Sequence, residues 1–347
     1  MATPSRKPQP RTFVYRSGTR IAGTVVACDA TGGGDLLFLS NALALRGAGP
    51  RAARVRASRC QVLTTAETLV LMGEAGERLR PRALTIAYGR PFGLGSLRVE
   101  LVPAGTLPGA AALSCEDGER RVFYAGAARL GTGGRGAAPG EVRAASALCI
   151  DATFGHPRFR FLSREDAEDR ARLFARDARD AGCAPVLLAT PLGPAQDLAC
   201  ALVAAGWQVR AHRAVLEAAA AYRRAGVAVP PMARFAGKLA RAEVLLWPPI
   251  DRGAGLIRRL GDVRVGWVSG GAADADAVAA MKVDTAIPYS HHADFEGLMA
   301  YVKATGAHEV AVKNGFPEEL VMALRARGHD AYAVGPPRQI DLFAAEA

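Results

Sequence analysis

Two patterns of apolar and polar residues divide the chain near residue 145. Between residues 12 and about 125, short apolar or alternating runs are separated by Gly, Pro and charged residues, which is typical of strands joined by turns. The expected strands are TVVAC (24–28), DLLFLS (35–40), ALTIAY (83–88), SLRVELV (96–102) and RVFYAG (121–126). The run 66–79 predicts a helix, and the glycine-rich run 131–141 predicts a flexible surface loop.

The second part of the chain alternates strand and helix patterns. We expect strands over 147–154 (ending at Asp151), 184–190, 207–215, 242–249, 263–271, 308–315 and 330–335. Helices are expected over 163–182, 193–206, 294–306 and 316–328, the first of them with Ser163 as N-cap and Gly182 as C-cap. Such alternation predicts parallel β/α layers.

Length and composition favour a globular protein of one large or two medium domains. The chain has 347 residues, half of them hydrophobic. No uncharged apolar run approaches the ~18–20 residues of a membrane span, and residues 1–11 form a basic, Pro-rich arm without the apolar region of a signal peptide. The scattered cysteines form no CxxC pair and fit a reducing, cytoplasmic compartment.

The net charge of +11 favours a polyanionic partner such as nucleic acid, through phosphate contacts and counterion release. A generally Arg-rich proteome is the alternative explanation.

Several segments together resemble the metallo-β-lactamase-fold nucleases with a β-CASP cap, above all the ligase-associated DNA exonucleases and mRNA 3′-end-processing-factor-like proteins. The matching segments occur in the family's order: VPAGTLPGAAAL (102–113), RVFYAGAARL (121–130), IDATFGHPRFRF (150–161), VLLATPLGPAQDL (186–198), YRRAGVAVPP (222–231), WVSGGA (267–272), PYSHHADFEGL (288–298) and VKNGFPEELVMALRARG (312–328).

The resemblance implies an α/β fold, a metallo-β-lactamase-type αββα sandwich with an inserted β-CASP cap domain. The implied organisation is a flexible basic arm (1–11), the first part of the core (12–160), the cap (161–284) and the C-terminal part of the core (285–347). Active members of the family hold two zinc or manganese ions, which activate a water and stabilise phosphate displacement.

Most of the metal-ligand positions that the resemblance implies are occupied here by other residues. The family's HxHxDH run would fall at 53–65, which contains no histidine and no acid. An early strand-end acid, a His after PAG, a bridging Asp, an Asp before the SxHAD histidine and a late His correspond to Ser40, Thr106, Ala127, His291 and Asn314. The family's LGKAQ lysine corresponds to Pro194, and the first histidine of the chain is His156.

Three residues remain of the implied site: Asp151, His292 and Asp294. We expect Asp151 and His292 to form a hydrogen-bonded pair between cap and core, or else to contact a phosphate. Asp294 is expected to cap a helix that starts at Phe295, since an N-cap Asp satisfies unpaired N–H groups. Catalytic zinc needs about three protein ligands, so we expect no catalytic residue, no bound metal and no cofactor.

Candidate nucleic-acid contacts come from three stretches. Arg54, Arg56 and Arg59 stand where the metal run would be, and a solvated charged loop is the simpler interpretation. Arg158 and Arg160 alternate with Phe159 and Phe161, which suits single-stranded nucleic acid but equally suits a strand with Phe inward and Arg outward. Ser269 ends a strand, and its hydroxyl is a candidate hydrogen-bond donor to a phosphate.

The sequence therefore predicts a catalytically degenerate β-CASP nuclease homologue, a non-hydrolytic nucleic-acid-binding or scaffolding pseudoenzyme of DNA repair or RNA processing. Single-stranded DNA or RNA, an active nuclease paralogue and a repair or processing complex are the expected partners, with no membrane association. The alternatives are an active metal-dependent exonuclease with an atypical site, and an interaction module that binds only proteins.

Overall fold

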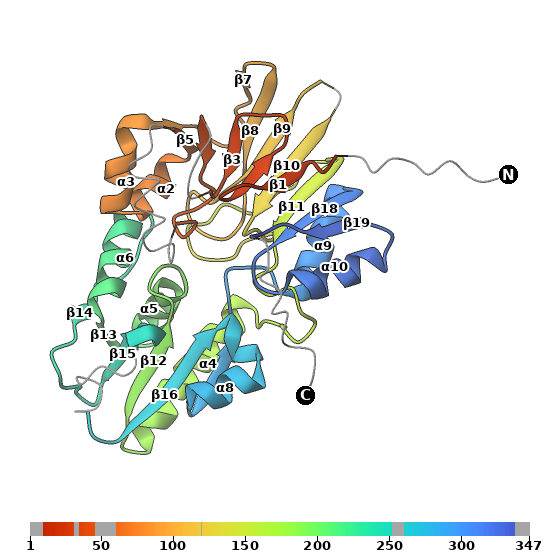
Figure 1. Ribbon diagram of the computed structural model, residues 1–347. Coiled ribbons are helices and arrows are strands. Elements are labelled where there is room, and N and C mark those ends of the chain that lie inside the picture. The colour runs from red at the N-terminus through yellow and green to blue at the C-terminus, as the bar shows by residue number, and fades with distance from the viewer. Residues whose placement is uncertain (1–9, 31–34, 46–59, 119, 252–259, 337–347) are drawn as a thin grey trace.

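A computed structural model describes residues 10–30, 35–45, 60–118, 120–251 and 260–336 of the chain (Figure 1). Its first sheet follows the chain order and consists of β1 (Phe13–Tyr15), β2 (Thr19–Ile21), β3 (Val26–Cys28), β4 (Leu36–Phe38), β5 (Gln61–Thr64) and β6 (Ala83–Thr85). The first three strands pair antiparallel, and β3 to β6 pair parallel.

The second sheet has the order β19-β18-β11-β10-β9-β8-β7. Its strands are β7 (Phe92–Leu94), β8 (Leu97–Pro103), β9 (Ala111–Glu116), β10 (Arg121–Gly126), β11 (Ala147–Asp151), β18 (Glu309–Lys313) and β19 (Asp330–Ala333). The half from β7 to β10 is antiparallel, and the half from β10 to β19 is parallel.

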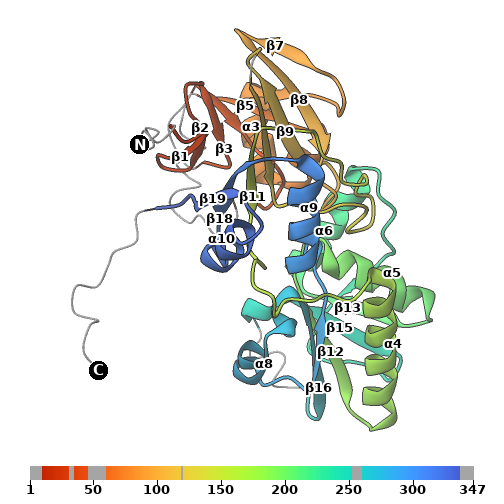
Figure 2. The same ribbon diagram turned by 90° about the vertical axis from the view of Figure 1, so that its right-hand side faces the viewer.

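These two sheets stack face to face and form what we call the sandwich (Figure 2). Side chains of both sheets, such as Phe38, Leu63, Leu113 and Tyr124, fill the space between them. The helices α2 (Ala66–Leu71) and α3 (Glu74–Leu79) cover the outer face of the first sheet. The helices α9 (Phe295–Thr305) and α10 (Pro317–Arg325) cover the outer face of the second sheet.

A third sheet belongs to an inserted unit, residues 164–288, that lies between β11 and β18 in the chain. It is parallel throughout, with the order β14-β13-β15-β12-β16-β17. The strands are β12 (Ala184–Ala189), β13 (Gln208–Ala211), β14 (Ala233–Arg234), β15 (Glu243–Trp247), β16 (Val263–Ser269) and β17 (Thr285–Pro288). Because β17 pairs in this sheet, the inserted unit extends four residues past the sequence boundary at 284.

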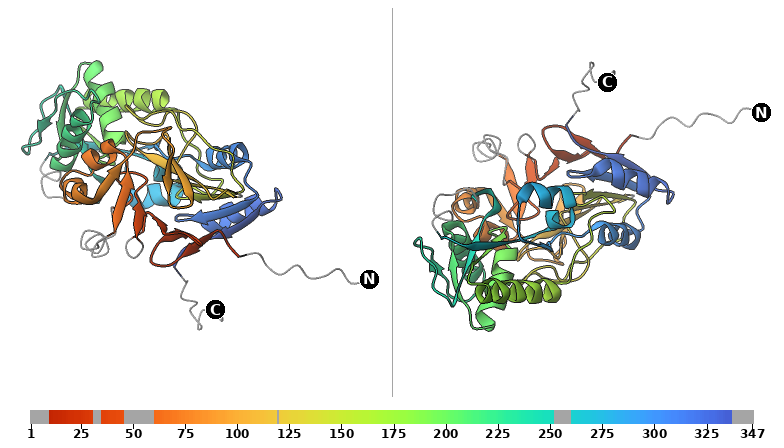
Figure 3. Two further views of the ribbon diagram at one scale, coloured as in Figure 1. Left: turned by 90° about the horizontal axis from the view of Figure 1, so that it is seen from above. Right: turned by 90° about the horizontal axis from the view of Figure 1, so that it is seen from below.

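Helices cover both faces of the third sheet. The helices α4 (Arg164–Asp180) and α5 (Pro194–Ala204) pack on one face, and α8 (Ala275–Met281) packs on the other. The helix α6 (Arg213–Arg224) joins the apolar cluster of the second sheet through Ala218, Ala219 and Tyr222. In both views of Figure 3 the green segments of the inserted unit and the dark-blue strands β18 and β19 lie at opposite ends of the molecule.

The mixed α/β class that the sequence predicted is present, and several boundaries agree. Ser163 caps α4 by accepting a hydrogen bond from the Asp166 N–H, which confirms the predicted N-cap. The helix predicted over 66–79 is divided at Gly73, whose φ of +60° interrupts helical geometry. No helix of the described residues is both long and apolar enough to cross a membrane.

Two predictions about local structure were wrong. The strand predicted over 207–215 stops at Ala211, because the His212 ring accepts a hydrogen bond from the Ala214 N–H and starts α6. The loop 131–141 is not a surface loop along its whole length, since Gly133 and Gly134 are buried against His291.

All six cysteines are free thiols, and Cys28, Cys115 and Cys149 are buried between the two sheets of the sandwich. Burial raises the pKa of Cys115 and Cys149 to about 12. These two thiols therefore stay protonated near neutral pH and act as core residues, because the thiolate is the reactive form.

Asp294 caps α9 as expected, since its carboxylate accepts hydrogen bonds from the Gly297 N–H at 2.9 Å and the Phe161 N–H at 3.1 Å. We predict that Asp294→Ala lowers the free energy of unfolding by about 1–2 kcal/mol, because two backbone donors lose their acceptor. Asp294→Asn keeps an acceptor oxygen and is the control. Urea unfolding of the three proteins measures the difference, and equal stability of Asp294→Ala and wild type would contradict the capping role.

Candidate functional site

A pocket of about 160 Å³, which we call the cleft pocket, opens between the sandwich and the inserted unit. The sandwich contributes residues that follow the ends of its strands, namely Asn41, Leu43, Thr106, Ala127, Thr153 and Phe154. The inserted unit and the loop after it contribute Thr190, Leu192, Ser269, Ser290, His291 and His292. The carboxyl ends of parallel strands commonly form ligand sites, because their loops converge there.

The structure brings most of the degenerate family positions to this pocket. The replaced positions Thr106, Ala127 and His291 line it, together with the retained His292. Ser40 lies directly beside it, because its hydroxyl accepts a hydrogen bond of 2.9 Å from the Asn41 amide. Asn41 and Leu43, which the sequence reasoning did not single out, bring the end of β4 into the cleft.

Asp151 ends β11 and is held by neighbours within the sandwich. Its carboxylate accepts hydrogen bonds from the Thr153 N–H at 2.8 Å and from the Asn314 amide at 2.6 Å. Within the described part of the chain it makes no hydrogen bond to His292, so the expected Asp151–His292 pair was wrong. Asn314, which follows the neighbouring strand β18, takes the place of that partner.

His292 is half-buried, and its ring lies edge-on to Phe154 with the ring centroids 5.9 Å apart. Burial lowers the pKa of His292, although the nearby Asp151 carboxylate acts in the opposite direction. The imidazole is therefore neutral at pH 7, and the cleft pocket carries no cation from this residue.

A second network connects the two sheets of the sandwich next to the cleft. The Asp29 carboxylate accepts hydrogen bonds from the Ser40 N–H at 2.8 Å, the Ser40 hydroxyl at 2.7 Å and the Tyr124 hydroxyl at 2.8 Å. The Lys313 ammonium donates to the Tyr124 oxygen at 2.7 Å. The structure therefore supplies one buried cation for the carboxylates at this end of the sandwich.

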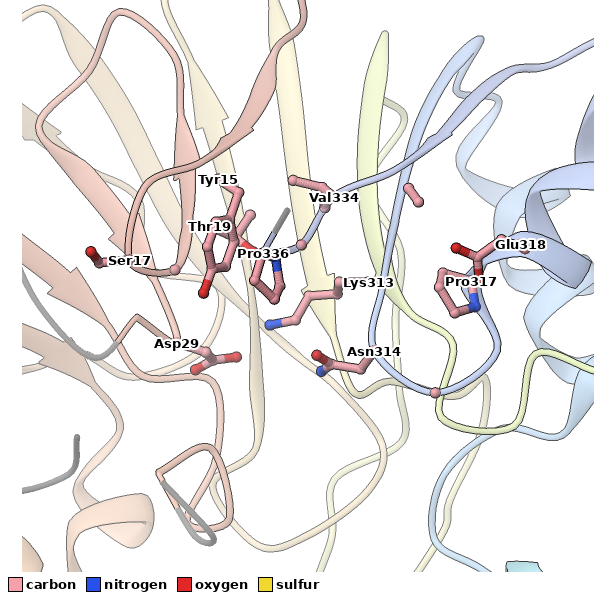
Figure 4. A pocket seen from close by; sticks show the side chains of 14 residues that line it. Tyr15, Ser17, Thr19, Asp29, Lys313, Asn314, Pro317, Glu318, Val334 and Pro336 are labelled. Carbon is pink, nitrogen blue, oxygen red and sulfur yellow. The ribbon is translucent and has the colours of Figure 1, made fainter. Parts of the chain in front are cut away.

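Lys313 is buried, and burial, the largest single effect, would lower its pKa; the nearby groups together, Asp29 first among them, outweigh burial, so the pKa is raised. Its side chain and that of Asn314 extend from the end of β18 toward Asp29, into a larger open cavity of about 640 Å³ (Figure 4). Sequence reasoning missed this residue. The available signal was a lysine inside the apolar strand HEVAV-K.

A third buried network holds the loop that carries His291. The His291 Nε2 atom lies 2.6 Å from the Asp197 carboxylate, which also accepts from the Tyr289 hydroxyl at 2.8 Å and the Arg135 N–H at 3.1 Å. Burial, the largest single effect, would raise the pKa of Asp197. The charge of His291 and these hydrogen bonds together outweigh burial, so the pKa is lowered. Sequence reasoning missed Asp197. The feature that could have indicated it is an acidic residue inside the otherwise mostly apolar helix α5.

The arginine candidates lie in different places. Arg158 is exposed, forms a 3.1 Å ion pair with Asp274 and lies over the Phe316 ring at 4.9 Å. Arg160 is exposed, whereas Phe159 is buried, which fits the inward-Phe and outward-Arg alternative. Ser269 accepts a hydrogen bond from the Gly271 N–H and caps a short turn. Arg54, Arg56 and Arg59 lie outside the described residues.

The donor atoms at the cleft do not fit the two-metal centre that the family resemblance implies. Among the described residues, no three His, Cys, Asp or Glu side chains gather in a way that could hold a metal. The Asp151 carboxylate is already bonded to Thr153 and Asn314, and Thr106 and Ala127 offer neither imidazole nor carboxylate. A catalytic zinc needs about three such ligands, so no chemical step is derived through a metal.

Comparison with known proteins relates the chain to a curated protein. No family model matches the chain. A protein named "Probable DNA ligase" from Opitutus terrae (strain DSM 11246 / JCM 15787 / PB90-1) is 30% identical to it over 292 residues. The match covers 82% of this chain and 28% of that protein, so the chain spans little more than a quarter of the length of its curated relative.

This similarity corrects the functional prediction made from the sequence. The chain was expected to be a degenerate β-CASP nuclease homologue of DNA repair or RNA processing, with an active exonuclease or a protein-only module as alternatives. That prediction, including the assignment to a nuclease class, was wrong, because the curated relative carries the name of a DNA ligase. The prediction compared the residues of this chain with the metal ligands of a nuclease. Such a comparison shows which ligands have been replaced, but it cannot indicate a role in a different reaction.

The Asp197–His291 pair predicts a component of acid sensitivity. The pKa of Asp197 is lower in the folded chain than the value of about 3.9 for a free Asp, so its stabilisation is complete above that value and is lost as the pH falls through the folded pKa. We expect Asp197→Asn to flatten the decrease in unfolding free energy below about pH 4. Urea unfolding from pH 6 to pH 2 measures the slope, with the exposed Asp180→Asn as control. Identical slopes for wild type and Asp197→Asn would refute this assignment.

The donor count at the cleft predicts weak metal binding. After incubation with zinc and manganese and then desalting, we expect well below one tightly bound ion per chain by inductively coupled plasma mass spectrometry, because a closed set of ligands is absent from the described cleft. Two retained ions per chain would contradict this reading of the donor atoms. Asp151→Asn is the matched variant for any ion that does remain.

Proposed function

We propose that this protein binds DNA and takes part in DNA ligation by handling the ends that are joined. The observation that carries the proposal is the 30% identity over 82% of the chain to a probable DNA ligase. Since the match covers only 28% of that relative, this chain corresponds to one segment of it. We therefore assign this segment the binding of DNA ends and leave the joining chemistry to another polypeptide or another part of the relative's chain.

The charge of the chain supports a DNA partner. A net charge of +11 attracts the phosphate backbone and releases its condensed counterions. Arg158 and Arg160 are exposed on the loop after Asp151, and Phe154 of the same loop lines the cleft pocket. Exposed cations on a loop that also contributes to the pocket lining can hold a phosphate backbone near the pocket, where the end of a strand can enter.

We also propose that the architecture is the metallo-β-lactamase-type αββα sandwich with a β-CASP-like cap. The support is topological. Two sheets stack between the pair α2 and α3 and the pair α9 and α10. The whole parallel third sheet enters the chain after β11 and ends before β18, two strands that are neighbours in the second sheet. An insertion at this point places its loops over the carboxyl ends of the sandwich strands.

The proposal predicts a preference for DNA ends. We expect the protein to bind a fluorescent linear duplex, and binding to become weaker as salt is raised, because phosphate contacts release counterions. Closed circular DNA of the same sequence should compete less well than linear DNA at equal mass. Fluorescence anisotropy with competitor titration measures both effects.

The double variant Arg158→Ala/Arg160→Ala tests whether these two exposed arginines contact the phosphate backbone of the DNA. Each lost phosphate contact reduces the slope of log K against log[salt] by about 1, so the double variant should show a reduced slope. The control is Arg176→Ala, an exposed arginine on α4. Absence of DNA binding at low salt, or equal competition by closed circles, would sink the proposal of end binding.

A further inference from the structure

The lining of the cleft pocket carries no uncompensated charge, because the imidazole of His291, one of its residues, is paired with the Asp197 carboxylate at 2.6 Å. Its sixteen residues include no Asp, Glu, Lys or Arg, and the half-buried His292 has a lowered pKa. A buried phosphate is normally held by Arg, Lys or several backbone N–H groups, because its charge must be compensated. The pocket is therefore better suited to a neutral polar group than to a phosphate.

The size and walls of the pocket suit a small, flat group. Its volume of about 160 Å³ is below the ~300–1,000 Å³ of sites for drug-sized ligands. Phe154 forms an aromatic wall, and Leu43, Leu107 and Leu192 add apolar surface. Pockets for extruded nucleobases combine aromatic and apolar walls of this kind with hydrogen bonds to the edge of the base.

The Phe154 wall is fixed in position by its neighbours. Its ring centroid lies 4.9 Å from that of Phe161 and 5.1 Å from that of Phe159, both in edge-to-face arrangements. The Gly270 backbone packs against the same ring, since a Cβ added there would lie 2.3 Å from Phe154 Cζ. A ring that is held this way can receive a base at little cost in side-chain entropy.

Several polar groups in the lining retain hydrogen-bonding capacity. The Ser269 and Ser290 hydroxyl oxygens accept from backbone N–H groups at 3.2 and 3.1 Å, and their own protons remain available for donation. His291 is 4% exposed, and its Nδ1 atom is buried without a hydrogen-bond partner among the described residues. The Gly134 and Gly193 backbones pack against this nitrogen, so the hydroxyl groups of the lining, and not His291, supply the hydrogen bonds to a ligand.

We propose that the cleft pocket receives one unpaired nucleobase from the end of a DNA strand, while the exposed Arg158 and Arg160, on the same loop as the lining residue Phe154, contact the phosphate backbone outside. This inference rests on the proposed function and deepens it by naming the part of the DNA that enters the pocket. The preferred substrate is then a frayed or single-nucleotide overhanging end.

The test compares two duplexes that carry the same phosphates. One has a single unpaired nucleotide at the 3′ end, and the other has an abasic analogue at that position. We expect about tenfold tighter binding of the duplex with the base, since stacking of one base contributes ~1–3 kcal/mol and 1.4 kcal/mol is a factor of ten. With 2-aminopurine as the overhanging base, its fluorescence reports whether the base has left the stack and entered a protein site.

Two variants connect the effect to this pocket. Ala127→Met fills the pocket from its sandwich side, and Thr190→Val removes a lining hydroxyl with little change of volume. Both should reduce the preference for the base, Ala127→Met most, and the circular dichroism spectrum checks that each variant is folded. Ala300→Met, an exposed alanine on α9, is the matched control and should keep the tenfold preference.

The outcomes separate this inference from the proposed function. Equal affinity for the base-bearing and abasic ends, with end binding retained, would overturn the nucleobase site and leave the proposed function standing. A preference for the base that survives Ala127→Met and Thr190→Val would place the base elsewhere and also overturn the inference. Absence of binding to any DNA end would overturn both.

Discussion

The parallel pairing of β11 with β18 is the constraint on which the rest of the molecule depends. Asp151 and Lys313 are partners at the end of this pairing, although more than 150 residues separate them in the chain. The inserted unit leaves the second sheet after Asp151 and the chain returns to it at Glu309. Because the chain leaves at the carboxyl end of β11, and α9 carries it back to the amino end of β18, the loops of the inserted unit lie over the carboxyl ends of the sandwich strands, and the cleft pocket forms between them.

Polar networks then fix the two sides of that cleft. On the sandwich side, Tyr124 connects the Lys313 ammonium to the Asp29 carboxylate, which also holds the backbone of Ser40. On the other side, Asp197 holds His291 and Tyr289. Burial of a single charge costs several kcal/mol unless it is paired and hydrogen-bonded, and each of these carboxylates accepts at least three hydrogen bonds. The networks are therefore compatible with a stable core and give the cleft a defined geometry.

Local patterns predicted much of the fold, and long-range geometry explains what they missed. Helix α4 could be predicted because Ser163, its first-turn acids and its apolar spacing are all local signals. Helix α6 was missed because its alanines give little contrast between the buried and exposed faces and because its N-cap, His212, is an unusual capping residue. Asp29, Lys313 and Asp197 could not be placed, because each acquires its role from a partner that is distant in the chain. The order of the strands in the sheets also depends on such pairings.

The resemblance grouped positions that the structure also brings together, but the function inferred from them was wrong. Thr106, Ala127, His291 and His292 meet in one pocket, as the resemblance implied. The interpretation failed because it treated each replaced ligand as a loss from a nuclease centre, whereas the relative is a probable DNA ligase. Motif comparison records which charges have gone and cannot show how the remaining side chains are paired, which requires the three-dimensional structure.

The electrostatic arrangement of the cleft follows from these pairings. Asp151 is bonded to Asn314, Asp29 is compensated by Lys313, and Asp197 is paired with the lining residue His291, so these three described acids near the cleft all have partners within the protein. The groups that face the opening are consequently hydroxyls, rings and aliphatic side chains, while exposed arginines stand on the adjacent loop. A polyanion is attracted to these exposed cations, but its phosphates meet no Arg or Lys inside the pocket. The element of DNA that such a pocket can admit is therefore its uncharged one, the base.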